Sequence, residues 1–127
     1  MNQAQAEDFV KQIFRDIWEG HDLNKFDQYY HPEIETNLAG KTIGFSEIRL
    51  HAEIMKQTWV NTKVVFKDII SNGDNKIAVR FMMSGTKEDQ PIAFEMMGIY
   101  ELKDNKFYRI FGLSNPPMIY SEERKEI

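Results

Sequence analysis

A change in hydrophobic period along the chain restricts its fold more than any other feature. Near the start, apolar residues recur at steps of three and four, the spacing of one helix face. These residues are Ala6, Phe9, Val10, Ile13, Phe14, Ile17 and Trp18. From residue 62 the period becomes two, which is typical of strands with one buried face. Helices followed by strands predict an α+β fold, with the helices packed on one face of a sheet.

Two more helices are expected after the first, which ends near Gly20. Asp22 can cap a short helix that runs to Tyr30, because its carboxylate can accept from first-turn amides and Pro32 prevents continuation. Ser46 is the candidate cap of a third helix that reaches about residue 57. The inward stripe of this third helix is Ile48, His51, Ala52 and Met55.

Five strands are predicted, and the last four form an antiparallel meander. The first strand covers residues 33–38, and the others cover 62–71, 76–85, 91–102 and 106–114. The segments between the last four are short and polar, as hairpin turns require. The expected product is a curved, mostly antiparallel sheet with three helices on one face.

The two faces of this sheet are distinguished by charge. One parity of the last three strands is mostly apolar: Val79, Phe81, Met83, Phe94, Met96, Gly98, Tyr100, Tyr108 and Ile110. The other carries Arg80, Glu95, Glu101 and Arg109. Burying an unpaired charge costs several kcal/mol, so the apolar parity should face the helices. We interpret Arg80, Glu95 and Arg109 as a surface or interface ladder, and a catalytic cluster is the alternative.

Composition excludes several classes of function. The chain has no cysteine, which removes disulfides, thiolate nucleophiles and cysteine metal sites. Its net charge of −4 opposes the phosphate backbone, so nucleic acid is not an expected partner. His21, His31 and His51 do not have the spacing of a local metal site, and we expect no metal and no cofactor.

The expected protein is cytoplasmic and does not contact a membrane. Charged residues interrupt the N-terminal segment, and no apolar stretch approaches the length of a membrane span. One domain should occupy residues 1–127, with a core at about 5–115 and a tail at 116–127.

An adaptable apolar pocket is one interpretation of the inward face. The chain has seven methionines, whose flexible side chains suit such pockets. The candidate ligand-binding residues are Phe14, Tyr30, Asn37, His51, Met55, Trp59, Phe81, Met83, Phe94, Met96, Tyr100 and Ile110. The alternative interpretation is an ordinary core without a ligand.

Three polar residues are the catalytic candidates within this set: His51, Asn37 and Tyr100. An imidazole on the inward face of the third helix could be a general base or a hydrogen-bond partner of a ligand near neutral pH. It could equally be a hydrogen-bonded core histidine. Trp59 either roofs the cavity mouth or covers the end of the third helix.

The order of elements resembles the nuclear transport factor 2-like superfamily, which includes SnoaL-like and ketosteroid-isomerase-like proteins. The resemblance covers about residues 5–115 and rests on three loose motifs. They are Trp18-Glu19-Gly20-His21-Asp22 after the first helix, Tyr30-His31-Pro32-Glu33 after the second, and the late hairpin at 103–111. It implies a cone-shaped fold with a cavity at its wide end, and dimerisation through the outer sheet face.

The chain lacks the catalytic residues that the known activities of this superfamily require. Ketosteroid isomerases need a tyrosine, a carboxylate base and a protonated acid, where this chain offers Phe14, Asn37 and about Gly98. SnoaL-like cyclases have a tryptophan and an acidic base in the last strand, where Phe111 and Asn115 stand. The Asp-Arg-Asp relay of epoxide hydrolases has only Arg80 and Glu95 nearby, on the outer parity.

Three functions follow as hypotheses. The first is binding of a small, mostly apolar molecule, with His51 and Asn37 as the polar points of the pocket. The second is an enzyme of proton transfer, hydration or dehydration, with His51 as base. The third is a non-catalytic homodimer or interaction module that uses the outer sheet face.

Overall fold

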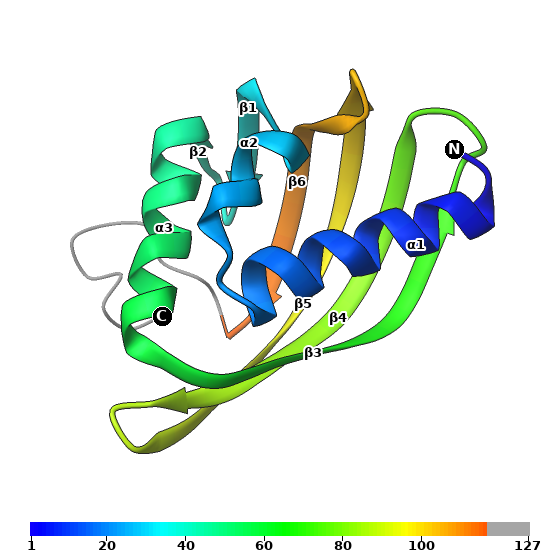
Figure 1. The fold of residues 1–127 in the computed structure, drawn as a ribbon. Coiled ribbons are helices and arrows are strands. Elements are labelled where there is room, and N and C mark those ends of the chain that lie inside the picture. Colours follow the sequence, from blue (N-terminus) through cyan, green and yellow to red (C-terminus); the bar gives the residue numbers. More distant parts are fainter. Residues whose placement is uncertain (117–127) are drawn as a thin grey trace.

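The computed structural model describes residues 1–116, and the predicted tail lies, from residue 117 onward, outside the described residues. One mixed sheet carries all the strands, and the helices lie on one of its faces (Figure 1). The α+β cone expected from the sequence is confirmed. Within residues 1–116, no helix has both the length and the apolar character needed to cross a bilayer.

The helical part precedes most of the sheet. Its segments are α1 (Gln3–Ile13), a π-helical segment (Phe14–Glu19), a 3-10 turn (Leu23–Lys25), α2 (Phe26–Tyr29) and α3 (Phe45–Thr58). The strands are β1 (Tyr30–Leu38), β2 (Lys41–Gly44), β3 (Trp59–Ser71), β4 (Lys76–Lys87), β5 (Gln90–Lys103) and β6 (Lys106–Asn115).

The order of strands in the sheet is β2-β1-β6-β5-β4-β3. Strands β3 to β6 form the predicted antiparallel meander, and β1 joins its edge by pairing with β6 in parallel. β2 was not predicted; it follows a turn at Ala39 and Gly40, both with positive φ, and pairs with β1. Gly40 is therefore part of the turn of a short hairpin.

Helix α1 is fixed at its start by a reciprocal cap. The side chain of Asn2 accepts from the backbone N–H of Gln5 at 2.8 Å, and the Gln5 side chain accepts from the backbone N–H of Asn2 at 3.0 Å. Gln3 also accepts from the backbone N–H of Ser71 at 2.9 Å. These bonds hold the first turn of α1 against the end of β3.

The first helix ends in a π-helical segment instead of a regular last turn. The backbone N–H of Gly20 donates to the carbonyl of Arg15 at 2.9 Å, a five-residue step. A Cβ at position 20 would lie 2.9 Å from that same oxygen, so the close approach requires glycine. Phe14 and Trp18, four residues apart in this segment, both point into the interior.

Two predicted helix caps are wrong. Asp22 precedes the 3-10 turn but makes no cap hydrogen bond; its carboxylate lies 4.0 Å from the Lys25 ammonium instead. Ser46 lies inside α3, whose N-cap is Gly44. The Glu47 carboxylate accepts from the backbone N–H of Gly44 at 3.2 Å, which satisfies the first turn without a serine.

A hydrogen-bonded pair joins the π-helical segment to α2. The Tyr29 hydroxyl donates to Asp16 at 2.6 Å, and Lys25 lies 3.6 Å from the same carboxylate. Burial and the hydrogen bond to Asp16 both raise the pKa of Tyr29. This contact sets the angle at which the short helix returns toward β1.

The predicted strand faces hold except at one β-bulge in β6. Glu101 pairs with Arg109 and Leu102 pairs with Phe107, which leaves Tyr108 as the extra residue. Tyr108 is therefore not an inward residue, and its ring lies beneath the Arg109 guanidinium, 3.9 Å away. Phe107 is instead fully buried, a position that strict alternation assigns to the outside.

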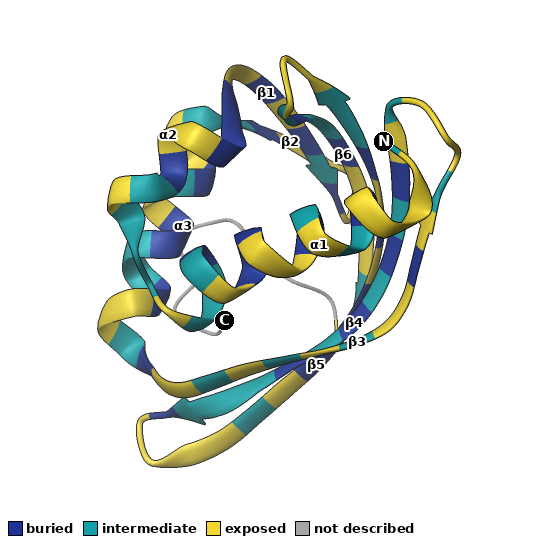
Figure 2. Ribbon diagram, turned by 45° about the vertical axis from the view of Figure 1, so that its right-hand side comes forward, coloured by how far each residue is buried: buried dark blue, intermediate teal, exposed yellow. Residues whose placement is uncertain are grey.

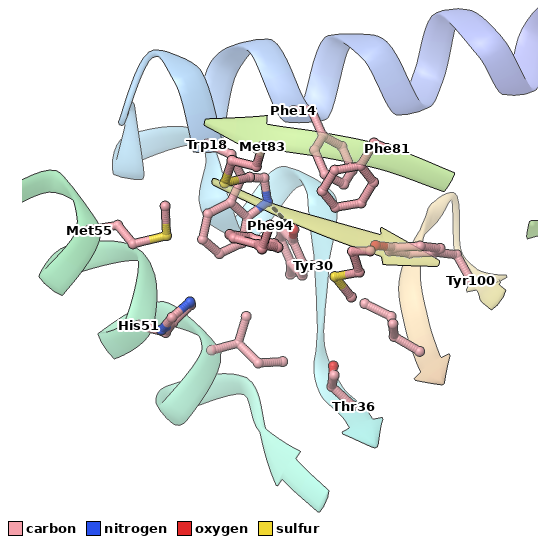
Figure 3. Close-up of a pocket in the computed structure, with 13 residues that line it drawn as sticks. Phe14, Trp18, Tyr30, Thr36, His51, Met55, Phe81, Met83, Phe94 and Tyr100 are labelled. Atoms are coloured by element: carbon pink, nitrogen blue, oxygen red, sulfur yellow. Dashed lines mark hydrogen bonds between the residues drawn. The ribbon is translucent and has the colours of Figure 1, made fainter. Parts of the chain in front are cut away.

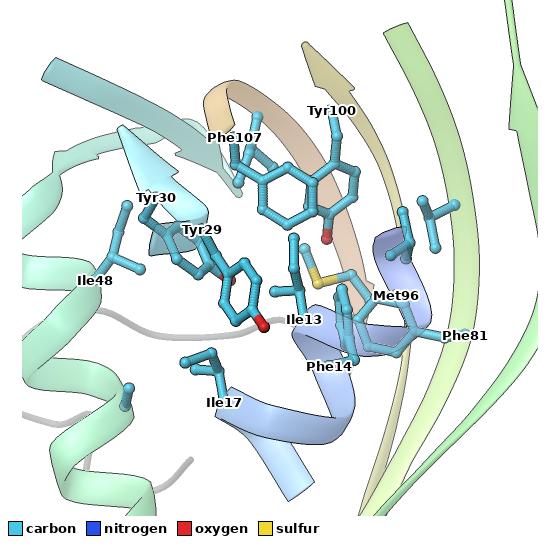
Figure 4. Packing of buried hydrophobic residues seen from close by; sticks show 14 of the residues in the cluster. Ile13, Phe14, Ile17, Tyr29, Tyr30, Ile48, Phe81, Met96, Tyr100 and Phe107 are labelled. Carbon is cyan, nitrogen blue, oxygen red and sulfur yellow. The ribbon is translucent and has the colours of Figure 1, made fainter. Parts of the chain in front are cut away.

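The apolar parity faces the helices and forms the core (Figures 2 and 4). The charged parity is the outer face, as predicted. Arg80 bridges Asp68 at 2.8 Å and Glu95 at 3.3 Å across three strands. Arg109 does not join this ladder; it pairs with Glu35 on β1 at 3.2 Å. Exposed ion pairs of this kind contribute little to stability.

Candidate functional site

A partly open cavity of about 60 Å³ lies between the helices and the inner sheet face (Figure 3). We call it the apolar cavity. Its lining residues are Phe14, Trp18, Tyr30, Thr36, Ile48, His51, Met55, Phe81, Met83, Phe94, Met96, Tyr100 and Ile110. None of these lining residues is Asp, Glu, Lys or Arg. An anionic ligand would therefore meet no Lys or Arg and a cationic ligand no carboxylate, and His51 is the one lining side chain that can carry a positive charge.

One wall of the apolar cavity is an aromatic cluster. The Phe14 ring meets Phe81 edge to face at 4.8 Å and Tyr100 at 6.4 Å. Trp18 donates through Nε1 to the Tyr30 hydroxyl at 2.9 Å, which fixes both rings. Flat, rigid walls of this kind favour an apolar body that can lie against aromatic faces.

The methionines of the lining come from both sides of the apolar cavity. Met55 lies one turn from His51 on the inward face of α3. Met83 and Met96 lie beside Phe94 and Phe81 on β4 and β5. Methionine side chains can change shape at small energetic cost. The lining of the apolar cavity therefore combines rigid aromatic rings with adjustable methionine side chains.

Two polar side chains, Thr36 and His51, point into the apolar cavity from β1 and α3 (Figure 3). His51 is 4% exposed, and its ring lies 5.9 Å from that of Trp18. Thr36 is 6% exposed, and its hydroxyl has no hydrogen-bond partner among the described residues. A buried hydroxyl left in that state costs about 1–3 kcal/mol, so the Thr36 site calls for an explanation.

Ten of the twelve candidate residues line the apolar cavity: Phe14, Tyr30, His51, Met55, Phe81, Met83, Phe94, Met96, Tyr100 and Ile110. Their place is established; whether they bind a ligand stays a prediction. Asn37 is wrongly placed by the sequence interpretation. Its side chain lies on the outer face, where it donates to Thr42 at 3.3 Å, because β1 alternates and Thr36 takes the inward position.

Trp59 is buried but does not belong to the cavity lining. Its ring lies against Gly85, where a Cβ would approach it to 2.9 Å, and it meets Phe94 edge to face at 6.2 Å. Of the two interpretations of Trp59, covering the end of the third helix is the one that fits this position, since Trp59 is the C-cap of α3.

Sequence reasoning missed three lining residues: Trp18, Thr36 and Ile48. Trp18 and Ile48 were assigned to inward helix stripes but not to the pocket. For Thr36 the sequence did carry a pattern, because Thr36 shares a parity with the apolar residues Ile34 and Leu38. The structure shows that all three are buried. Assigning the apolar parity of β1 to the inside would have selected Thr36 instead of Asn37.

The three histidines lie in separate places. The Nε2 of His21 is 3.3 Å from the Thr62 hydroxyl, and burial, with a smaller effect from Lys56, lowers the pKa of His21. His31 lies 3.4 Å from the Asp104 carboxylate. In residues 1–116, no three His, Asp or Glu side chains gather as a metal site.

The positions of the family's catalytic residues also lack the required chemistry. Phe111 and Asn115 lie on the exposed face of β6 and cannot reach the apolar cavity. Gly98 faces inward, but the Tyr100 ring fills the space beside it, 3.0 Å from an added Cβ. Arg80 and Glu95 are on the outer face, as the parity predicted.

Solved structures share the fold at low sequence identity. AclR of Streptomyces galilaeus superposes with a TM-score of 0.77 at 12% identity, over 89% of this chain and 80% of that one. IdmH of Streptomyces antibioticus gives 0.75 at 14%, over 88% and 93%. An epoxide hydrolase of Mycobacterium tuberculosis, described as LEH-like, gives 0.73 at 13%, over 88% and 84%. Identities this low show the fold alone.

The sequence itself carries a family signature over most of its length. The model of the SnoaL-like domain matches residues 10–110, which include α2, α3, every strand up to β5 and all the residues that line the apolar cavity. No curated protein matches the chain in sequence. From the match of the domain model, the chain belongs to the SnoaL-like domain family, within the nuclear transport factor 2-like superfamily.

Proposed function

We propose that this protein binds a small, mostly apolar molecule in the apolar cavity. The observation that carries the proposal is the cavity itself: a space of about 60 Å³ with aromatic and methionine walls and polar side chains from β1 and α3. Binding sites for small molecules combine apolar walls with a few placed polar groups in this way.

Binding is favoured over catalysis by the chemistry of the lining. The similar structures include IdmH, proposed to be a polyketide cyclase, and an epoxide hydrolase, so members of the fold differ in reaction. Acid-base chemistry on such substrates commonly uses a carboxylate, and none lines the apolar cavity here. Proton transfer with His51 as base is the catalytic alternative.

The size of the cavity limits what can enter without rearrangement. A water molecule needs about 10–15 Å³ of such space, so 60 Å³ holds only a few waters or a small organic group. Met55, Met83 and Met96 are the flexible side chains of the lining and can move aside for a larger ligand. We therefore expect these three methionines to report binding most directly.

Titration of the protein with cyclohexanone is expected to shift the methyl resonances of Met55, Met83 and Met96. The measurement is a proton-carbon correlation spectrum of protein labelled with ¹³C at the methionine methyl groups. All three methyls line the apolar cavity, and their environment changes when it fills. Met97 is an internal control, because it lies on the outer face of the sheet and does not line the apolar cavity.

A shift of Met97 equal to those of the three cavity methionines would indicate non-specific binding. If these resonances stay unchanged up to the solubility limit of cyclohexanone and of larger ketones, the proposed function is contradicted. Assignment rests on single Met→Leu variants, which preserve volume closely enough to keep the fold.

We further propose that two copies of the chain associate through the outer sheet face. Four large apolar side chains lie exposed there on paired positions of β5 and β6: Met97 opposite Leu113, and Ile99 opposite Phe111. Their exposed fractions run from 52% to 61%. A contiguous exposed patch is typical of an interaction surface, and a self-complementary sheet face suits a two-fold dimer.

Replacing Ile99 with glutamate is expected to weaken this dimer by more than about 100-fold, because each interface would bury two unpaired carboxylates at several kcal/mol each. Sedimentation velocity across a dilution series measures the effect. Leu50→Glu is the control, since Leu50 is also exposed but lies on α3, away from the outer face. A wild-type protein that is monomeric at high micromolar concentration would refute the dimer.

A further inference from the structure

The unpartnered Thr36 hydroxyl is the feature of the apolar cavity that apolar binding alone does not explain. Its oxygen is buried, and no described residue satisfies it. The neighbouring positions on the same face of β1, Ile34 and Leu38, are apolar and buried. Valine would fit the strand equally well, since it has nearly the same shape as threonine and the same preference for strands.

We propose that Thr36 determines ligand specificity, and that the ligand is a neutral molecule whose single oxygen function, a carbonyl or hydroxyl, bonds to the Thr36 hydroxyl. This inference rests on the proposed binding function and adds the chemical class of the ligand. The Thr36 hydroxyl can donate a hydrogen bond to a carbonyl oxygen. With an alcohol it can either donate the hydrogen bond or accept it.

The neutral character of the ligand follows from the lining. A carboxylate or phosphate brought into the apolar cavity would lose its hydration and meet no Lys or Arg among the lining residues. A pure hydrocarbon would fill the space but leave the Thr36 oxygen without a partner. A neutral oxygen compound is the class that satisfies both the walls and the hydroxyl.

The position of Thr36 also sets the direction in which such a ligand lies. Thr36 enters from β1, whereas the rings of Phe14, Phe81 and Phe94 come from the π-helical segment, β4 and β5 (Figure 3). The oxygen of the ligand therefore lies at the β1 side, and its apolar body extends toward the aromatic wall. Thr36 acts by holding the ligand, not by taking part in a reaction.

Two probes of nearly equal shape test the inference: cyclohexanone and methylenecyclohexane, which has a CH₂ group in place of the oxygen. Their dissociation constants are measured through the methionine methyl shifts in wild type, Thr36→Val and Thr36→Ser. In Thr36→Val, the affinity for cyclohexanone should fall about tenfold relative to the affinity for methylenecyclohexane, because one buried hydrogen bond is lost. Thr36→Ser keeps the hydroxyl and should hold this ratio within about twofold of wild type.

The outcomes separate the inference from the proposed function. If both probes bind and Thr36→Val leaves their ratio unchanged, the role of Thr36 is overturned while the binding function stands. If neither probe binds wild type, both fail. Cyclohexanecarboxylate is the third probe, and binding as tight as that of cyclohexanone would overturn the neutral class. The unliganded methyl spectrum of each variant shows that it is folded.

Discussion

Replacement of Phe107 with alanine is expected to lower the free energy of unfolding by about 3–5 kcal/mol, the usual cost of removing a fully buried ring. Phe107 is completely buried. Its ring centroid lies 5.7 Å from that of Phe9. The ring centroids of Tyr30 and Tyr100 (Figure 4) lie 5.4 Å and 4.7 Å from it. These partners belong to α1, β1 and β5, so one ring joins three parts of the fold.

Urea denaturation of wild type and variant measures this loss. Leu50→Ala is the control, because the Leu50 side chain is 42% exposed and lies on α3, away from the face proposed for the dimer. The free energy of unfolding of this control variant should fall by about 1 kcal/mol or less, since surface substitutions usually have small effects. Similar losses for the two variants would contradict the bulge that places Phe107 inside. Because domains are stable by only about 5–15 kcal/mol, Phe107→Ala removes a large share of the total.

The burial of Phe107 could not be predicted from the sequence. Alternation along residues 106–114 predicts Tyr108 and Ile110 on one face, and only Ile110 lies there. A single extra residue opposite the step from Glu101 to Leu102 reverses the parity before the bulge. No residue type marks this bulge in the sequence, so its position depends on how β5 and β6 pair in three dimensions.

The helices and the meander could be predicted because their signals are local. Period, turn residues and proline positions act within a few residues, and the observed strand ends lie within about three residues of the predicted ones. Helix caps were less predictable. The N-cap of α3 is Gly44 instead of Ser46, and the Glu47 carboxylate accepts a hydrogen bond from the backbone N–H of Gly44. The short β2 has only four residues and forms because β1 offers it an edge.

Most of the cavity lining was predictable for the same reason. Phe81, Met83, Phe94 and Met96 alternate on uninterrupted stretches of β4 and β5, where parity is reliable. The error at Asn37 had a different origin. It came from matching Asn37 to the base position of ketosteroid isomerases, whereas the parity of β1 itself selects Thr36. Local alternation was the better guide at this position than the resemblance.

Phe14→Ala is expected to destabilise the protein by about 3 kcal/mol or more and to enlarge the apolar cavity. The Phe14 ring meets Phe66 at 5.3 Å and Phe81 at 4.8 Å, and its other side forms part of the cavity wall. The π-helical turn holds its backbone, so the surroundings can close only partly around the space left by the ring. The new space joins the existing one and should admit larger apolar molecules.

The distinctive part of this prediction is rescue by a ligand. Toluene, which resembles the lost side chain, should bind the variant and restore about 1.4 kcal/mol when its concentration is ten times its dissociation constant. Thermal unfolding with and without toluene measures this gain. Phe9→Ala is the control, because Phe9 packs on Phe107 from the same helix but does not line the apolar cavity. That variant should lose stability without being rescued. Equal rescue of both variants would mean that toluene binds wherever a ring is removed, so the apolar cavity would have no special capacity for ligands.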